Sequence, residues 1–229
     1  MENALNFSGK VVLVTGGGKG VGKGITECFL AAGADVVICG RSAPATLPQC
    51  DGREALFTLC DVRDYEQIEA CVAFAVQHFG RLDVLVNNAG GAPFAAAATA
   101  SPRFSESIIR LNLSTIRPSP GTAAYGAAKA GLVNLGTSLA VEWAPKVRVN
   151  ALVVGLTETE QAHLHYGDKD GIAAVGATIP LGRMAVPTDV GNACLFLASK
   201  LASYVSGTNF AVHGGGEKPA FLNAANVKS

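Results

Sequence analysis

The chain has 229 residues, of which 49% are hydrophobic and 16% are charged, so it has ample material for a buried core. Its 18 basic and 18 acidic residues give a formal net charge of zero, which offers no electrostatic reason to expect nucleic acid or an acidic membrane surface as a partner. No apolar run is long enough to span a membrane, and Met1–Ser8 does not resemble a secretion signal. We therefore expect a cytoplasmic protein with one domain over residues 1–229, of which 218–229 form a loose tail.

Cysteine and histidine show no metal-binding pattern. The six cysteines contain no Cys-x-x-Cys pair, and most lie in predicted strands or helices, which is typical of small buried residues in a reducing compartment. His163 and His165 are two residues apart and would not share a helix face. We therefore expect no metal site.

A buried strand is predicted at Lys10–Thr15, where four apolar residues follow one another. The glycine-rich segment Thr15–Gly22 comes next and leads into a helix predicted over Gly22–Gly33. This order indicates a dinucleotide site, because glycine lets the backbone approach a pyrophosphate and a helix N-terminus offers free N–H groups. A glycine-rich turn that binds nothing is the alternative. The residues expected to contact the cofactor here are Gly16, Gly18, Lys19, Gly20, Val21 and Gly22.

A second strand, predicted at Asp35–Gly40, completes a βαβ unit and therefore a parallel sheet. A dinucleotide fingerprint normally places an acidic residue at the end of this strand for the ribose hydroxyl, but here Arg41 follows it. A carboxylate would repel a 2′-phosphate, whereas Arg41 can bind one through two parallel N–H bonds, and Lys19 could reach the same group. The two cations favour NADP over NAD, unless both are simply solvated surface charges.

After a loop at 43–52, a third strand is predicted at Glu54–Cys60. Asp64 then has the position of an N-cap for a helix over Tyr65–Phe79, whose apolar residues fall on one side. Asp61 has two interpretations: it accepts a hydrogen bond from an adenine amino group, or it caps the turn.

A fourth strand is predicted at Leu82–Val86, and it ends in Asn-Asn-Ala-Gly. Together with the glycine-rich turn, the Asp61-Val62 pair and the Tyr125-x-x-x-Lys129 spacing, this order of motifs resembles the short-chain dehydrogenase/reductase family, from about residue 10 to about residue 216. The resemblance implies a doubly wound α/β Rossmann fold with a parallel sheet, and a homotetramer or homodimer built on the helix that carries Tyr125. It also implies that the cofactor is contacted by Asp61, Val62, Asn88, Ala89 and Gly90.

The same resemblance makes Tyr125 the catalytic acid/base, with Lys129 lowering its pKa and holding the nicotinamide ribose. The spacing agrees, because residues four apart on a helix predicted over Gly121–Trp143 share one face. A phenol, whose ordinary pKa is about 10, needs a nearby cation to act near neutral pH. Packing plus a solvated charge is the alternative for this pair. Thr159 matches the family's threonine that bonds the nicotinamide amide, or it caps a helix, within a mobile lid over Glu158–Thr178.

One block of the family pattern is missing from the sequence. The family carries a serine on a fifth strand, thirteen residues before the tyrosine, but that position is Asn112, which also fits the family's helix asparagine in a proton relay. No run of four apolar residues lies between a predicted helix at Ser101–Leu113 and the loop-like segment Ser114–Gly121. We therefore expect the fifth strand and its serine to be absent at Leu113–Ser114, with Ser114 a poor replacement.

Two explanations of this gap stay open. Either the chain lacks the block through deletion or alternative processing, or residues of the protein are left out of the sequence at this join. Downstream, the pattern predicts strands at Lys146–Val154 and Phe210–Val212, with a helix that starts at Pro187 between them.

These observations predict an NADP-dependent oxidoreductase that transfers a hydride between the cofactor and a small carbonyl or secondary alcohol substrate. The alternative is a catalytically impaired nucleotide-binding or scaffold relative, because the serine-bearing strand is absent. A third and weaker hypothesis is a dehydratase or isomerase on the same scaffold.

Overall fold

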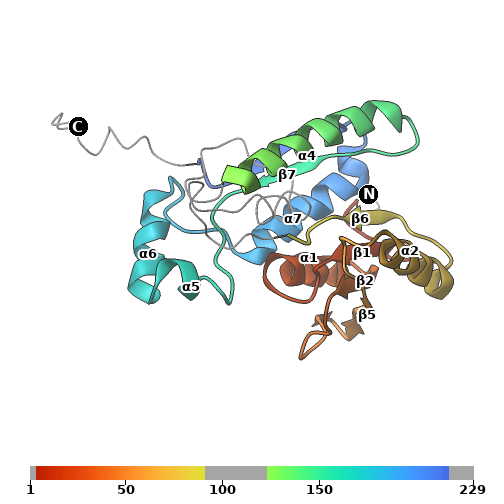
Figure 1. The fold of residues 1–229 in the computed structure, drawn as a ribbon, viewed down its shortest axis with the longest axis horizontal. Coiled ribbons are helices and arrows are strands. Elements are labelled where there is room, and N and C mark those ends of the chain that lie inside the picture. The colour runs from red at the N-terminus through yellow and green to blue at the C-terminus, as the bar shows by residue number, and fades with distance from the viewer. Residues whose placement is uncertain (1–3, 91–122, 217–229) are drawn as a thin grey trace.

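The computed structural model describes residues 4–90 and 123–216, and its main sheet has four parallel strands in the order β5-β2-β1-β6 (Figure 1). The strands are β1 (Val11–Thr15), β2 (Asp35–Gly40), β5 (Leu56–Leu59) and β6 (Val84–Val86). Strand β1 lies inside the sheet, and each of its five residues is buried. The continuous apolar sequence of β1 is therefore that of a strand covered on both faces.

Different helices cover the two faces of this sheet. Along β1, Val12 and Val14 pack on one face and Leu13 on the other, as the alternation of side chains in a strand requires. Helices α1 (Gly20–Ala31) and α7 (Pro187–Ala198) pack on the first face, and α2 (Tyr65–Phe79) packs on the second. The predicted doubly wound α/β fold is confirmed.

Helix α2 has the predicted bounds because both of its ends are capped. The Asp64 carboxylate accepts hydrogen bonds from the backbone N–H groups of Glu66 and Gln67, at 3.1 and 3.3 Å. Gly80 ends the helix with a φ of 75°, a left-handed conformation that glycine adopts without strain. The predicted N-cap role of Asp64 is confirmed.

Helices α1 and α7 approach each other closely at two glycines. A Cβ atom on Gly24 would lie 2.3 Å from the Cβ of Pro187, and one on Gly191 would lie 2.5 Å from the Sγ of Cys28. Any larger residue would therefore force the two backbones apart. The hydrophobic core around Phe29 and α7 also includes side chains of both β6 and β7, so one core joins the two parts of the sheet system.

Strands β7 (Ala151–Val154) and β8 (Asn209–Val212) form a separate two-stranded parallel sheet. In the described ranges no strand lies between β6 and β7 in the chain, and these two strands are not paired with each other. The fifth strand of the family pattern, which we expect this chain to lack, would lie between β6 and β7. The predicted helix at Ser101–Leu113, the join that follows it, and the predicted tail at 218–229 lie outside the described residues.

Helix α4 (Ala123–Glu142) crosses above β7 in Figure 1, and it makes only slight contact with the other described helices and strands. Its apolar side chains are correspondingly open: Leu135 is 46% exposed and Val141 is 76% exposed. A helix of this fold normally packs on a strand beneath it, so the open faces agree with a missing strand.

Two segments differ from the prediction. A small antiparallel hairpin, β3 (Gln49–Cys50) with β4 (Arg53–Glu54), replaces part of the predicted loop at 43–52. Its two turn residues have positive φ, 51° at Asp51 and 76° at Gly52, which is the Asp-Gly turn that favours hairpins. The predicted lid segment contains the helices α5 (His163–Tyr166) and α6 (Lys169–Thr178).

Strand β7 also starts later than the strand predicted at this place, at Ala151 and not at Lys146. The preceding residues bond instead to the loop before β8: Arg148 donates to the carbonyl of Val205 at 3.0 Å, and Gly207 N–H donates to Val149 at 2.7 Å. Among the described residues, no helix is both long enough and apolar enough to cross a membrane.

The Asp83 carboxylate joins the starts of β1 and β6. It accepts hydrogen bonds from the Val11 backbone N–H at 3.0 Å, the Lys10 ammonium at 3.0 Å and the Arg81 guanidinium at 2.6 and 2.8 Å. Burial alone would raise the pKa of Asp83, but the bonds from Arg81, Val11 and Lys10 outweigh it and hold the pKa at about 2.

We expect Asp83→Asn to lower the free energy of unfolding at pH 7 by about 1 kcal/mol, since the group is partly solvated. A depressed carboxyl pKa stabilises the fold above the unfolded-state pKa of about 3.9, and that stabilisation is lost as pH falls toward 2. Urea unfolding at pH 7 and pH 3 measures this loss, with Asp35→Asn as the control, because the exposed Asp35 carboxylate pairs with Arg53 at the longer distance of 3.4 Å. A gap between Asp83→Asn and wild type that does not shrink at pH 3 contradicts this role.

Candidate functional site

The turn between β1 and α1 follows a backbone path that only glycine permits. Gly16 and Gly20 have positive φ, 66° and 54°, and the Gly16 N–H donates to the Cys39 carbonyl at 2.8 Å. A Cβ atom on Gly22 would lie 2.2 Å from the Gly16 oxygen and 2.5 Å from the Asn88 amide nitrogen. The glycines therefore fold the turn tightly against the end of β1 and over the N-terminus of α1.

Thr26, a fully buried residue of α1, holds this turn from below. Its hydroxyl oxygen lies 3.1 Å from the carbonyl oxygen of Gly17 and 2.9 Å from that of Gly22. A buried hydroxyl without a partner is costly, so this bonding stabilises the turn in one conformation.

Thr15 and Asn88 join the turn to the end of β6. The Thr15 hydroxyl accepts the backbone N–H groups of Asn88 at 3.0 Å and Ala89 at 2.9 Å. The Asn88 side-chain amide donates in return to the carbonyls of Thr15 at 2.9 Å and Gly16 at 3.3 Å. The Asn-Asn-Ala-Gly motif that was expected to line the cofactor thus builds the wall of the glycine-rich turn.

Several expected contact residues are placed around this turn. A Cβ atom on Gly18 would lie 3.1 Å from the Pro44 side chain, which closes one side of the turn. Val21 packs on the core between the sheet and α1, and Val62 packs on the core beneath α2. Gly90 is exposed at the end of the described segment.

Two cations flank the turn. Lys19 and Arg41 are both exposed, and within the described residues neither side chain forms an ion pair or hydrogen bond. Arg41 follows the end of β2, and its positive charge contributes to lowering the pKa of Asp61. Cationic groups without acidic partners beside a helix N-terminus are suited to hold an anion.

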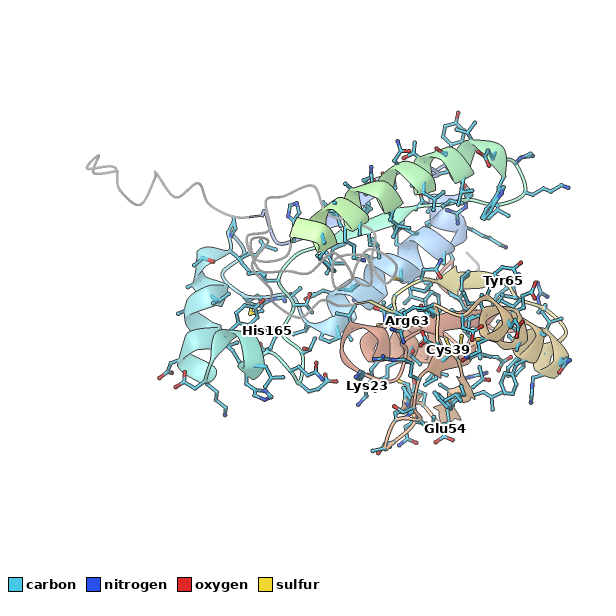
Figure 2. The ribbon with its side chains drawn as sticks, in the orientation of Figure 1. Lys23, Cys39, Glu54, Arg63, Tyr65 and His165 are labelled. Carbon is cyan, nitrogen blue, oxygen red and sulfur yellow. The ribbon has the colours of Figure 1, made fainter. Side chains whose placement is uncertain are left out.

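Asp61 is already bound within the chain. Its carboxylate accepts the Arg63 guanidinium Nε–H at 2.9 Å and the Arg63 backbone N–H at 3.1 Å; Figure 2 labels Arg63. The Arg63 side chain is the main reason that the pKa of Asp61 falls to about 2. Asp61 therefore caps its own turn, and its contact with an adenine amino group stays a prediction.

The segment before α5 contacts the turn in a way that the sequence did not predict. The Glu160 carboxylate accepts the Gly20 backbone N–H at 2.9 Å, at the start of α1. The Thr159 side chain is next to it, with its Cγ2 atom 3.7 Å from the place of a Cβ on Gly20. The Thr159 hydroxyl also accepts the Gln161 backbone N–H at 3.4 Å, in the turn that leads into α5, while Ala162 is the residue directly before the helix.

Tyr125 and Lys129 share one face of α4, as their spacing predicted. The Lys129 ammonium nitrogen lies 5.4 Å from the centre of the Tyr125 ring, above its face. Burial raises the pKa of Tyr125 and lowers the pKa of Lys129. Burial is the cause of the raised pKa of Tyr125, and the expectation that Lys129 lowers this pKa stays a prediction. Asn112 and Ser114 lie outside the described residues.

Two family models match the chain, one described as short chain dehydrogenase over residues 10–117 and one described as enoyl-(acyl carrier protein) reductase over residues 94–217. The 3-oxoacyl-(acyl-carrier-protein) reductase FabG of Chlamydia trachomatis is 31% identical over 241 aligned positions, which cover 90% of this chain and 96% of that protein. The chain belongs to the short-chain dehydrogenase/reductase family. The family consists of oxidoreductases that bind a nicotinamide cofactor.

Other similar proteins agree with this membership. The L-fucose dehydrogenase of Oryctolagus cuniculus is 33% identical over 256 aligned positions, covering 95% of this chain and 88% of that protein. The ligand-free aldohexose dehydrogenase of Thermoplasma acidophilum has a TM-score of 0.82 at 27% identity and covers 98% of both chains. A short-chain dehydrogenase/reductase of Mycobacterium marinum has a TM-score of 0.85 at 27% identity, covering 95% of this chain and 99% of that one.

The alignments also bear on the missing block. They span 241 and 256 positions, whereas the chain has 229 residues, so each contains positions of the relative with no residue of this chain opposite them. Together with the lack of pairing between β6 and β7 in the described residues, this supports an internal segment that the relatives have and this chain lacks.

We expect Thr15→Val to lower the free energy of unfolding by about 1–3 kcal/mol, because it leaves the backbone N–H groups of Asn88 and Ala89 without their acceptor. Thr15→Ser keeps the hydroxyl and serves as the matched control. Chemical unfolding gives the free energies, and hydrogen exchange reports the protection of residues 88 and 89. A loss in Thr15→Val that is no larger than the loss in Thr15→Ser would contradict the role of the hydroxyl.

Proposed function

We propose that the protein is an NADP-dependent oxidoreductase that transfers a hydride between NADP(H) and a small carbonyl or secondary alcohol substrate. The observation that carries the proposal is the pair of cations without acidic partners, Lys19 and Arg41, beside a glycine-rich turn at the N-terminus of α1. A 2′-phosphate bears up to two negative charges, which a carboxylate at the end of β2 would repel and Arg41 would bind. Family membership supports the reaction type.

The nicotinamide ring would supply and accept the hydride, and the protein would supply proton transfer and orientation. Tyr125 would give its hydroxyl proton to the carbonyl oxygen during reduction. Burial raises the pKa of Tyr125, so proton transfer near neutral pH would require a nearby cation to stabilise the phenolate. Lys129 is on the same face of α4 and would hold the ribose hydroxyls and compensate the charge of the phenolate that remains.

The proposed cofactor residues divide into two groups by what they do in the structure. The glycines 16, 18, 20 and 22 would let the pyrophosphate approach the backbone, while Lys19, Arg41 and Thr159 would contact the cofactor through side chains. We further propose that Asp61, Val62, Asn88, Ala89 and Gly90 shape the adenosine side mainly through backbone positions, with Asn112 in the proton relay.

We also propose that the protein acts in the cytoplasm as a homodimer or homotetramer. The open apolar side chains of α4, Leu135 and Val141 among them, support burial of this helix against a second copy. The molecular mass in solution, from light scattering, measures the assembly directly.

A second candidate function is a nucleotide-binding or scaffold protein with little catalytic activity. The specific observation in its favour is that, in the described residues, β6 and β7 are not paired with each other where the serine-bearing strand would lie, while α4, which carries Tyr125, makes only slight contact with the described elements. A catalytic tyrosine on a weakly supported helix would be less well oriented, and misplacement by about 1 Å can cost about a hundredfold in rate.

We expect the protein to bind NADPH more tightly than NADH, and Arg41→Ala to weaken NADPH binding by about tenfold or more while leaving NADH binding unchanged. Fluorescence titration with each dinucleotide measures both affinities. Lys23→Ala is the control, because Lys23 is an exposed cation of α1 that pairs with Glu27 at 3.7 Å. Equal affinity for NADPH and NADH would contradict the proposed cofactor preference.

Turnover separates the two candidate functions. A panel of aldehydes and ketones is assayed with NADPH, comparing wild type with Tyr125→Phe, which lacks the proton donor. Oxidoreductase function predicts turnover that Tyr125→Phe abolishes, whereas NADPH binding without turnover supports the scaffold function.

We expect Glu160→Gln to tighten NADPH binding by about two- to fivefold, because the Glu160 carboxylate occupies an N–H group of the turn and would repel the pyrophosphate. Glu158→Gln is the matched control, since that neighbouring exposed carboxylate makes no hydrogen bond with the turn in the described residues. Fluorescence titration with NADPH measures the affinity of each variant. If both variants change the affinity equally, the effect is general electrostatics and the specific contact does not compete with the cofactor.

A further inference from the structure

Three cysteines from three separate elements meet beneath the nucleotide side of the sheet. Cys39 is in β2, Cys60 directly follows β5, and Cys71 is in α2. Their three Sγ atoms all lie within 4.8 Å of one another, and the residues are only 2, 2 and 3% exposed. Figure 2 labels Cys39, which lies in the interior by the sheet and α2. We call these three residues the thiol cluster.

The surroundings of the thiol cluster are apolar. The cluster belongs to the hydrophobic core on the α2 face of the sheet, with Leu13, Val37 and Ala75 as its other fully buried members. The ligand atoms that the thiol cluster offers in this part of the core are therefore sulfurs. Hard cations such as Mg²⁺ and Ca²⁺ require several oxygen ligands, so the composition of the pocket disfavours them.

We propose that the thiol cluster is a binding site for one thiophilic d¹⁰ metal ion, with Cu(I) preferred. An ion about 2.3 Å from each sulfur, in the plane of the three, would hold the sulfurs about 4.0 Å apart, so the sulfurs, which now lie within 4.8 Å of one another, would have to approach by at most about 0.8 Å. Zn(II) prefers four ligands, and the cluster offers three at a site with almost no exposure to water. Three soft ligands in an apolar pocket suit Cu(I) better.

Binding of the metal ion would release the protons of the three thiols. Cys71 accepts a hydrogen bond from the Cys39 thiol, which lowers the pKa of Cys71 and raises that of Cys39, while burial raises the pKa of Cys60 to about 11. Cys71 is thus the first thiol to ionise. Each thiol that coordinates the ion releases its proton to solvent, and no electron is transferred, so the affinity rises with pH.

An ion at this site would affect the glycine-rich turn and Arg41 through backbone hydrogen bonds. The Cys39 carbonyl accepts the Gly16 N–H at 2.8 Å, and the Cys60 N–H donates to the Gly40 carbonyl at 3.0 Å. Arg41 and Asp61 are only one or two residues further along the chain. Joining β2, β5 and α2 through one ion would therefore stabilise the segment that carries Arg41, and would raise the unfolding temperature.

The test uses the full chain without any nucleotide, so its outcome does not depend on the proposed function. The reduced protein is titrated anaerobically with Cu(I) against a competing chelator and, separately, with Zn(II). We expect one equivalent of Cu(I), seen as added mass by native mass spectrometry and as thiolate-to-copper absorption in the near ultraviolet, together with a higher unfolding temperature. Tighter binding of Zn(II) than of Cu(I) would overturn the assignment of the ion.

Variants locate the site. Cys39→Ala, Cys60→Ala and Cys71→Ala should each weaken Cu(I) binding at least tenfold, whereas Cys194→Ala, a buried cysteine outside the cluster, should leave it unchanged. Binding that persists in the cluster variants, or that is lost in Cys194→Ala, overturns the proposal.

If a cysteine variant does not fold, an experiment on the wild-type protein tests the same site. Copper-loaded and metal-free wild type are alkylated under the same mild denaturant, and the modified cysteines are mapped by mass spectrometry. Protection confined to Cys39, Cys60 and Cys71 supports the site, and protection spread equally over all six cysteines overturns it.

Discussion

The hydrogen bonds between Thr15 and the chain at Asn88 and Ala89 are the interaction on which the rest of the site depends. They join the ends of β1 and β6, and they leave the glycine-rich turn no space for a side chain at Gly22. The position of that turn determines where the N-terminus of α1 presents its N–H groups. The roles proposed for Lys19, Arg41 and Glu160 depend on the position of this one backbone turn, which they surround.

The sequence predicted most reliably those elements whose signals are local. The bounds of β2 and α2 agree with the prediction, because β2 is a run of buried apolar residues and α2 has both an N-cap and a terminal glycine. The Asp-Gly pair at 51 and 52 was a usable hairpin signal that the sequence interpretation passed over. The late start of β7 was not predictable, since it depends on bonds to a loop more than fifty residues away.

In the candidate site, too, the sequence predicted what depends on local spacing and did not predict what depends on contacts between distant residues. Spacing alone placed Tyr125 and Lys129 on one helix face, but the direction of the pKa shift depends on burial, which spacing does not reveal. The roles of Asn88 and Asp61 within the chain, and the contact of Glu160 with Gly20, arise from tertiary proximity. No residue pattern marks an exposed glutamate as the partner of a turn 140 residues earlier. The thiol cluster was overlooked for the same reason, because its members come from three elements with no motif spacing.

The close crossing of α1 and α7 has a mechanical consequence. In the described parts of the chain, the four-stranded sheet and the β7–β8 sheet share no ladder of hydrogen bonds. Their relative position there depends on the shared hydrophobic core and on the close approach of the two helices at Gly24 and Gly191. A substitution that widens this helix crossing would therefore shift the two sheets relative to each other.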